Sequence, residues 1–157
     1  VWQAAGGTQA VRWTRPAGDR VLVLTAGSGG KTPKPGQVRC VDAATGNERW
    51  AAPCDLDFGS VPAATVAGDV LVGWTPTGEK AGDKPLARVI AFKLADGGMD
   101  KAWEGEPFVL DENPFHAAVD GKLYLVAQNA LRVHDATTGK LLAADDQFRS
   151  GSNPWLT

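Results

Sequence analysis

The sequence predicts an all-β protein built from three copies of one four-stranded unit. The first observation is that 19 glycines and 10 prolines among 157 residues fall in short clusters between apolar runs. Such spacing is typical of many turns and few long helices. The second observation is that the apolar runs are short and rich in strand-forming residues. The third is that they recur with a period of about fifty residues, as expected of a repeat architecture.

The repeat is clearest in an apolar run that follows a polar turn. The turn reads Ala-Gly-Asp, Ala-Gly-Asp and Val-Asp-Gly in the three copies. Asp19 and Asp69 are 50 residues apart, and Asp69 and Asp120 are 51 apart. We therefore expect equivalent strands at 19–24, 69–74 and 121–126.

A second run ends in a glycine in every copy. Residues 38–46, 89–97 and 131–139 align without gaps. Because glycine adopts a left-handed backbone conformation at little steric cost, we expect a tight hairpin turn at each one. The returning strands begin near 48, 101 and 141, and a further strand precedes each unit at 10–13, 60–64 and 115–119. The three glycines are Gly46, Gly97 and Gly139.

Four short strands in about fifty residues is the period of a β-propeller blade. We name the strands A to D and place the blades at about 9–54, 58–106 and 114–147 of a single partial domain, 1–157. Three blades fall short of the roughly 4–8 that close a propeller. We therefore expect part of a 7–8-bladed ring, completed by further sequence or by another copy of the chain.

The link between strands B and C differs most among the copies, at 27–37, 75–88 and 128–130. Insertions collect in surface loops, where they can serve binding. In a propeller these loops share a face with the D–A loops, so this face is the candidate site for a partner. The alternative is that its charges are only solvated. The candidate residues are Lys31, Lys34, Lys80, Lys84, Asp111 and Glu112.

Residues 40–50 (CVDAATGNERW) and 133–143 (VHDATTGKLLA) resemble the repeat of pyrroloquinoline-quinone-like (PQQ-like) β-propellers, Ala-x-Asp-x-x-Thr-Gly-x-x-x-Trp. The resemblance covers about 9–145. It implies that Trp50 and Trp103 each dock one blade on the next. The copies depart from the pattern at Lys93, Asp96 and Ala143. The remaining motif residues, which the resemblance implies are structural, are Asp42, Gly46, Gly97, Asp135 and Gly139.

That family contains quinone-dependent and calcium-dependent dehydrogenases, and also non-catalytic propellers such as envelope assembly lipoproteins and kinase sensor domains. The dehydrogenases use an adjacent cysteine pair, whereas Cys40 and Cys54 are fourteen residues apart. Asp111, Glu112 and Asn113 beside Pro114 favour a turn over a calcium site. No nucleophile elbow, zinc-protease motif or phosphate-binding glycine loop occurs.

We therefore expect a non-catalytic binding or scaffold module with no catalytic residue, no metal, and neither PQQ nor calcium as cofactor. Two alternatives stay open: a fragment of a PQQ-dependent quinoprotein dehydrogenase, and the extracytoplasmic sensor domain of a membrane serine/threonine kinase. His134 aligns with apolar residues, which favours a packing role. His116 begins an A strand, where a ligand in the channel could meet it.

Charge and hydropathy limit the classes of partner that this chain can bind. The net charge is -2 with no run of either sign, which excludes a nucleic-acid-binding stripe. No apolar stretch approaches the ~18–20 residues that cross a bilayer. We expect a protein or peptide partner and, by analogy with the family, a location at the bacterial cell envelope. A disulfide between Cys40 and Cys54 stays open, with two unpaired thiols as the alternative.

Overall fold

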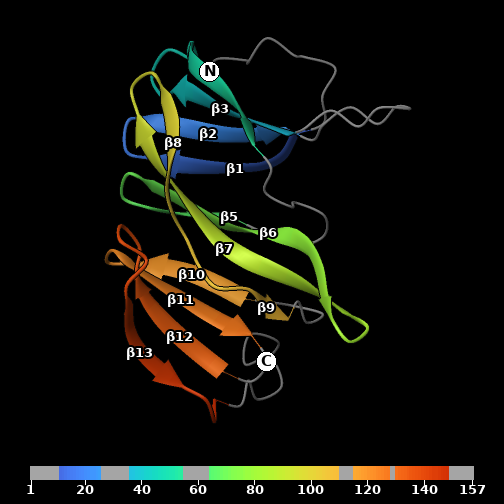
Figure 1. Cartoon of the computed structure of the whole chain (residues 1–157). Helices are drawn as coiled ribbons and strands as arrows, with labels where there is room; N and C mark the ends of the chain where they lie inside the picture. The colour runs from blue at the N-terminus through green and yellow to red at the C-terminus, as the bar shows by residue number, and fades with distance from the viewer. Residues whose placement is uncertain (1–10, 26–35, 55–63, 110–114, 128–129, 149–157) are drawn as a thin grey trace, which may run out of the picture.

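The computed structural model of the chain describes residues 11–25, 36–54, 64–109, 115–127 and 130–148. These residues form thirteen strands and no helix. The strands make three antiparallel sheets that follow one another along the molecule (Figure 1). The prediction of an all-β chain with three four-stranded blade-like units is confirmed.

The first and third sheets are simple four-stranded meanders, in which each strand pairs with the next along the chain. The first contains β1 (Val11–Ala17), β2 (Arg20–Thr25), β3 (Gly36–Asp42) and β4 (Glu48–Cys54). The third contains β10 (Phe115–Val119), β11 (Lys122–Ala127), β12 (Ala130–Asp135) and β13 (Leu141–Asp145).

The second sheet has the same order with a longer centre. It contains β5 (Ala64–Ala67), β6 (Val70–Ala81), β7 (Lys84–Ala95) and β8 (Gly98–Glu104), and the two-residue strand β9 (Phe108–Val109) pairs with the far part of β7. The expectation of a loop at 75–88 was wrong. That segment continues the β6–β7 ladder as far as the pair Ala81 and Lys84, with an irregularity between Pro76 and Lys80.

Strand register shows that the three units are equivalent residue by residue. Trp50 lies opposite Cys40, Trp103 opposite Ala91, and Ala143 opposite Val133, and each pairing is followed by a register shift at the same place. These partners occupy the same position in the aligned repeat. Ala143 therefore stands where the first two sheets carry tryptophan.

The two-residue A–B turns show that Asp120 was aligned one residue out of place with Asp19 and Asp69. Gly18 and Gly68 take the first turn position with positive φ, followed by an aspartate. In the third unit both Asp120 and Gly121 have positive φ, as a type I′ hairpin turn requires. Gly121, not Asp120, is thus the counterpart of Asp69, and its carbonyl accepts the same backbone bond from the C–D turn.

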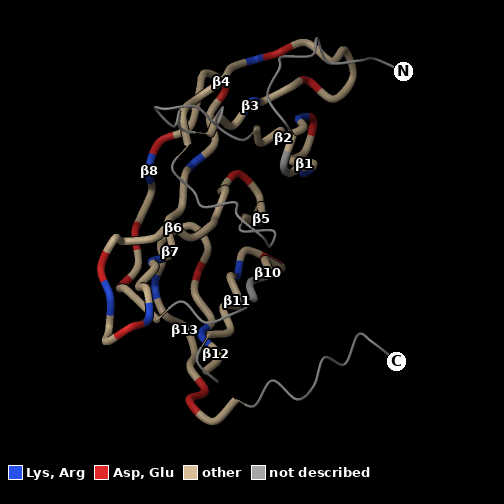
Figure 2. The backbone as a smooth tube through the Cα atoms, turned by 90° about the vertical axis from the view of Figure 1, so that its right-hand side faces the viewer, with Lys and Arg blue, Asp and Glu red and all other residues tan. Residues whose placement is uncertain are grey.

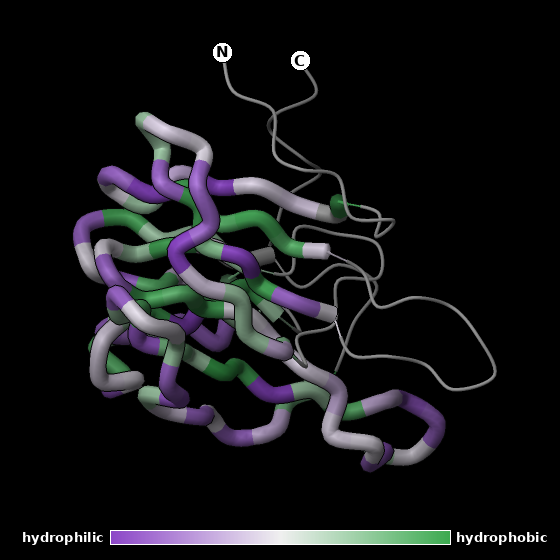
Figure 3. The backbone as a smooth tube through the Cα atoms, turned by 90° about the horizontal axis from the view of Figure 1, so that it is seen from above, coloured by the Kyte–Doolittle hydropathy of each residue, from purple (hydrophilic) through white to green (hydrophobic). Residues whose placement is uncertain are grey.

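Two apolar cores lie between the sheets, and the second sheet contributes to both. Leu71 belongs to the core shared with Leu22 and Leu24 of the first sheet. Its neighbours Val70 and Val72 belong to the core shared with Leu123 of the third sheet. Because successive strand residues point to opposite faces, the uninterrupted apolar start of β6 fits a sheet buried on both sides. The apolar segments accordingly gather in the interior strands (Figure 3).

Cys40 and Cys54 do not form a disulfide, so the open alternative of two separate thiols is the one found. Both side chains are buried in the first core. Cys40 lies opposite Trp50, whereas Cys54 lies opposite Gly36, four residues further along β3. At roughly 3.3 Å per residue this puts their Cα atoms about 13 Å apart. A disulfide requires less than about 7 Å.

Candidate functional site

Each of the first two sheets is bonded to the next through a tryptophan. Trp50 Nε1 on β4 donates to the carbonyl oxygen of Ala95 in the second sheet, at 2.9 Å. Trp103 Nε1 on β8 donates to the carbonyl oxygen of Ala136 in the third, also at 2.9 Å. Both acceptors lie at the C–D turn of the following unit. These are the contacts that a docking role for the two tryptophans requires.

The acceptor turn of the third sheet is organised by one carboxylate. Asp135 Oδ1 accepts from the backbone N–H groups of Thr137 and Thr138 and from the Thr138 hydroxyl, at 2.7–3.1 Å. The Gly139 N–H donates to the Asp135 carbonyl at 2.9 Å. The hydrogen bonds from Thr138, and then from Thr137, hold the pKa of Asp135 below its usual value, against partial desolvation.

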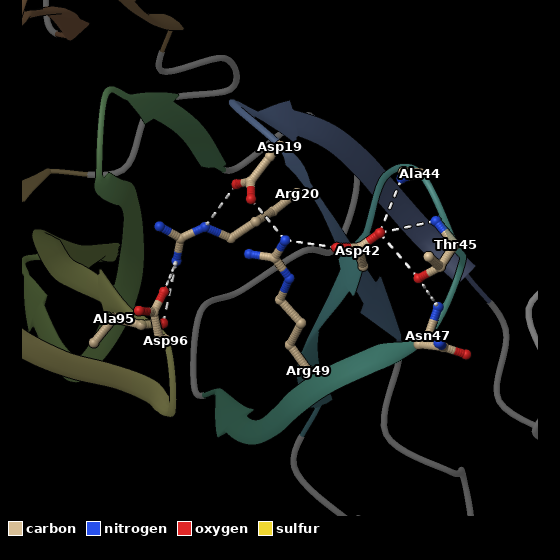
Figure 4. A network of polar contacts seen from close by, with 9 residues as sticks. All are labelled: Asp19, Arg20, Asp42, Ala44, Thr45, Asn47, Arg49, Ala95 and Asp96. Atoms are coloured by element: carbon tan, nitrogen blue, oxygen red, sulfur yellow. Dashed lines mark hydrogen bonds and ion pairs between the residues drawn. The ribbon is translucent and has the colours of Figure 1, made fainter.

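The first sheet repeats this turn bond for bond. Asp42 Oδ1 accepts from Ala44 N–H, Thr45 N–H and the Thr45 hydroxyl at 2.8–3.0 Å, and Gly46 N–H donates to the Asp42 carbonyl. Arg49 adds a charge: its Nη2 lies 2.6 Å from Asp42 Oδ2 and 2.6 Å from Asp19 Oδ2 (Figure 4). The hydrogen bond from Arg49 is the main reason that the pKa values of Asp42 and Asp19 are lowered.

A second arginine extends this network to the next sheet. Arg20 Nη1 donates to the Ala95 carbonyl at 3.2 Å, and Arg20 lies 3.6 Å from Asp19 and 3.9 Å from Asp96 (Figure 4). Ala95 therefore accepts from both Trp50 and Arg20. Sequence reasoning did not identify either arginine, because the partners they join are up to 75 residues away in the chain.

The middle unit lacks the carboxylate-organised turn. Lys93 stands in place of the aspartate and cannot accept hydrogen bonds, and the strand ladder instead continues to a two-residue turn at Asp96 and Gly97. The expectation of a left-handed glycine here was wrong: Gly97 has no positive φ, unlike Gly46 (77°) and Gly139 (73°).

Gly139 also matters for space, because a Cβ built there would lie 2.6 Å from Trp103 Cδ2. The Trp103 indole also stacks on the ring of His134, a residue of β12 next to this turn, with ring centroids 6.4 Å apart. His134 Nδ1 donates to the Gly139 carbonyl at 3.0 Å, since a carbonyl can only accept. The packing role predicted for His134, with one ring nitrogen satisfied, is confirmed.

The partner face predicted from the sequence is the one at the strand ends away from the C–D turns. The β6–β7 hairpin extends there past its neighbours, with Lys80 and Lys84 exposed near its tip. Charges of both signs lie along it, and its tip is hydrophilic (Figures 2 and 3). Its base is buried, because Trp74 and Ala87 pack with Phe108 of β9. The other candidates, Lys31, Lys34, Asp111 and Glu112, lie outside the described residues, as does the side chain of His116.

Beside the hairpin base lies an open hollow of about 300 Å³ between the second and third sheets. Its polar residues are Arg132 and Asp146, whose side chains pair at 2.5 Å. The hollow has no counterpart in the sequence pattern, because its wall includes β9, which is too short to recognise from a pattern. The hollow is lined by Phe108, Leu125, Ala127, Ala130, Arg132 and Asp146.

The part of the chain that the structure describes contains no cluster of side chains suited to metal binding. No three His, Cys, Asp or Glu side chains among those residues gather as a metal site would require. Burial raises the pKa of the Cys40 thiol, which keeps it in the less nucleophilic protonated form. None of the described segments is a helix long and apolar enough to cross a membrane.

Comparison with known proteins finds structural likeness without a match in sequence. No protein-family model matches the sequence, and no curated protein matches it. The crystal structure of BamB from Moraxella catarrhalis is similar over 92% of this chain and 52% of that chain, with 13% sequence identity and a TM-score of 0.45. This chain thus spans about half the length of that protein.

Proposed function

We propose that this chain is a non-catalytic β-propeller module that binds a protein or peptide through the face carrying the β6–β7 hairpin. The observation that carries the proposal is the hairpin itself. Its two strands have twelve residues each, whereas the strands of the first and third sheets have five to seven. A supported strand pair that projects beyond its sheet offers both side chains and backbone to a partner.

The hairpin combines a fixed base with an accessible tip. Trp74 and Ala87 at the base are 7% and 0% exposed. Toward the tip, the Thr77 hydroxyl donates to the Leu86 carbonyl at 3.2 Å and accepts from Glu79 N–H at 3.1 Å, which shapes the irregular stretch. Such pre-organisation lowers the entropy cost of binding. The adjoining hollow supplies an apolar wall and one ion pair for a side chain of the partner.

The arrangement of ionisable groups supports a non-catalytic role. Among the described residues, the carboxylates with lowered pKa at the C–D turns are engaged within their own sheets. Asp42 is bonded by Arg49 and by donors of its turn, and Asp135 is bonded by donors of its turn. They lie at the strand ends opposite the hollow. Perturbed groups that hold turns together are structural, whereas a catalytic pair would converge on a cleft.

A photo-crosslinking amino acid placed at Lys84 tests the binding face in the cells that produce the protein. We expect a discrete adduct from position 84 and none from position 93, an exposed lysine site at the other end of the same strand. The double substitution Lys80→Ser, Lys84→Ser should weaken binding of the captured partner, while Lys93→Ser, Lys122→Ser should not. Equal adducts from both ends of the strand would contradict the proposal.

The dehydrogenase alternative has its own test. Equilibrium dialysis of the purified chain against PQQ with calcium should show no saturable binding, because no three acidic side chains gather among the described residues to hold a hard cation. Stoichiometric binding would favour the enzyme instead. The cell-envelope location is part of the proposal through the resemblance of the repeat alone, and fractionation of the producing cells checks it.

A further inference from the structure

The outer strands of the three sheets differ in how they protect their free edge. Among the described strands, β4, β8 and β13 each end a sheet, so one side of each backbone lacks a strand partner. Charged residues and proline on an edge oppose pairing with another chain. β4 carries Glu48, Arg49 and Pro53, and β8 carries Asp100, Lys101 and Glu104. β13 reads Leu-Leu-Ala-Ala-Asp, with no charge before its last residue.

The two leucines of β13 are unusually accessible. Leu141 and Leu142 are 49% and 48% exposed, and every residue of the strand is exposed. Burying such side chains is favourable at about 25 cal/mol per Å² of apolar surface. An edge strand with free backbone groups and exposed leucines has the features of a strand-pairing site.

Stacking of a further sheet would not cover Leu141. Leu141 lies opposite His134, the position that Glu48 takes opposite Val41 and Lys101 takes opposite Phe92. Glu48 and Lys101 both remain exposed, although their sheets each have a neighbour docked through a tryptophan. The contact that joins neighbouring sheets therefore leaves this position open to solvent.

We propose that β13 pairs antiparallel with β13 of a second copy of this chain, extending the third sheet across a two-fold axis. The charges select the register. Pairing centred on Ala143 places Lys140 opposite Asp146 of the second copy, Leu141 opposite its Asp145 and Leu142 opposite its Ala144. Opposite charges facing each other across strands are stabilising. Asp146 is 76% exposed at its side chain, although it also pairs with Arg132.

Because the contact is two-fold, the ion pair between Lys140 and Asp146 and the contact between Leu142 and Ala144 each form twice. A register centred on Leu142 would instead put Lys140 opposite an alanine and leave both ion pairs unmade. Asp146 also lines the hollow beside the hairpin, whereas Lys140, Leu141 and Leu142 do not line it. Because five residues a side form a small interface, we expect a weak dimer, with a dissociation constant of about 10–100 µM.

Sedimentation equilibrium of the full chain from about 5 to 500 µM tests the proposal. Wild type should shift from monomer to dimer across this range. Leu142→Lys should raise the dissociation constant at least about tenfold, because it places a charge on the edge. The matched control is Ala102→Lys, at the equivalent position of β8, which should leave dimerisation unchanged.

Charge complementation fixes the register without relying on Leu142. Lys140→Glu and Asp146→Lys should each weaken self-association, whereas an equimolar mixture of the two variants should dimerise about as well as wild type. In the mixed dimer one ion pair forms with reversed sign and the other forms as in wild type. A monomer at every concentration overturns the proposal. So does a dimer insensitive to Leu142→Lys, or a mixture that fails to recover. If Leu142→Lys loses its near-ultraviolet circular dichroism, the variant is misfolded. The mixture of Lys140→Glu and Asp146→Lys then decides whether the proposal holds.

Discussion

Trp50 and Trp103 each combine a large apolar surface with one donated hydrogen bond across a sheet boundary. Buried tryptophans without that bond occur in the same molecule. Trp13 is 7% exposed, as is Trp50, but its Nε1 has no hydrogen-bond partner. Comparing Trp50 with Trp13 therefore separates the contribution of the hydrogen bond to stability from the contribution of burial.

Trp50→Phe should lower the free energy of unfolding by about 1 kcal/mol beyond the loss from reduced ring area, because the indole N–H to Ala95 is removed. Trp50→Ala should cost about 3–5 kcal/mol. Trp13→Phe should cost less than Trp50→Phe, because no hydrogen bond is lost. Urea denaturation at neutral pH measures all three, and equal losses for the two phenylalanine variants would refute a role for the bond.

Two turn glycines make a matched pair. Gly139→Ala adds a Cβ 2.6 Å from the Trp103 ring at a residue with φ of 73°. It should lower stability by about 1–3 kcal/mol. Gly97→Ala meets no atom within 4 Å and has no positive φ, so it should be neutral or slightly stabilising. Thermal unfolding compares them, and equal shifts would contradict the assigned turn geometries.

At the scale of elements, the conformation of each C–D turn depends on whether the residue at position 42, 93 or 135 can accept hydrogen bonds. Asp42 and Asp135 build the same loop, whereas Lys93 allows the ladder to run on. The sequence alignment identified these positions correctly but not the consequence at Lys93. That consequence depends on which register the returning strand takes, and the alignment does not contain this information.

The lowered pKa values of Asp42 and Asp135 predict an acid-dependent loss of stability. A carboxyl with a folded pKa below its unfolded value stabilises the fold fully above the unfolded pKa, near 3.8. That contribution is lost as pH falls further, toward the folded pKa. Asp42→Ala should therefore flatten the dependence of the melting temperature on pH below about pH 4. Lys93→Ala, at the equivalent position of the middle unit, should leave the slope unchanged.

At the scale of the whole molecule, the sequence predicted what repeats and missed what does not. Gapless runs gave three sheets and their order, because strand pairing between neighbours follows from hairpin turns. The long β6–β7 hairpin was read as a loop, because its glycines and prolines at 76–85 carry the signals of a turn. The hollow and the bond from Arg20 to Ala95 depend on contacts between units, which no local pattern encodes. Strand β9 and the Arg49 ion pairs lie within single sheets, but they join segments that are distant in the chain.

Neighbouring sheets in this molecule are joined by indole N–H groups bonded to backbone carbonyls. Hydrogen exchange of the six tryptophan indole protons, followed by NMR on the ¹⁵N-labelled chain, measures this directly. The indole protons of Trp50 and Trp103, assigned through their phenylalanine variants, should exchange as slowly as the amides of the strands around them. Exchange of both at the rate of a solvent-exposed indole would contradict the account.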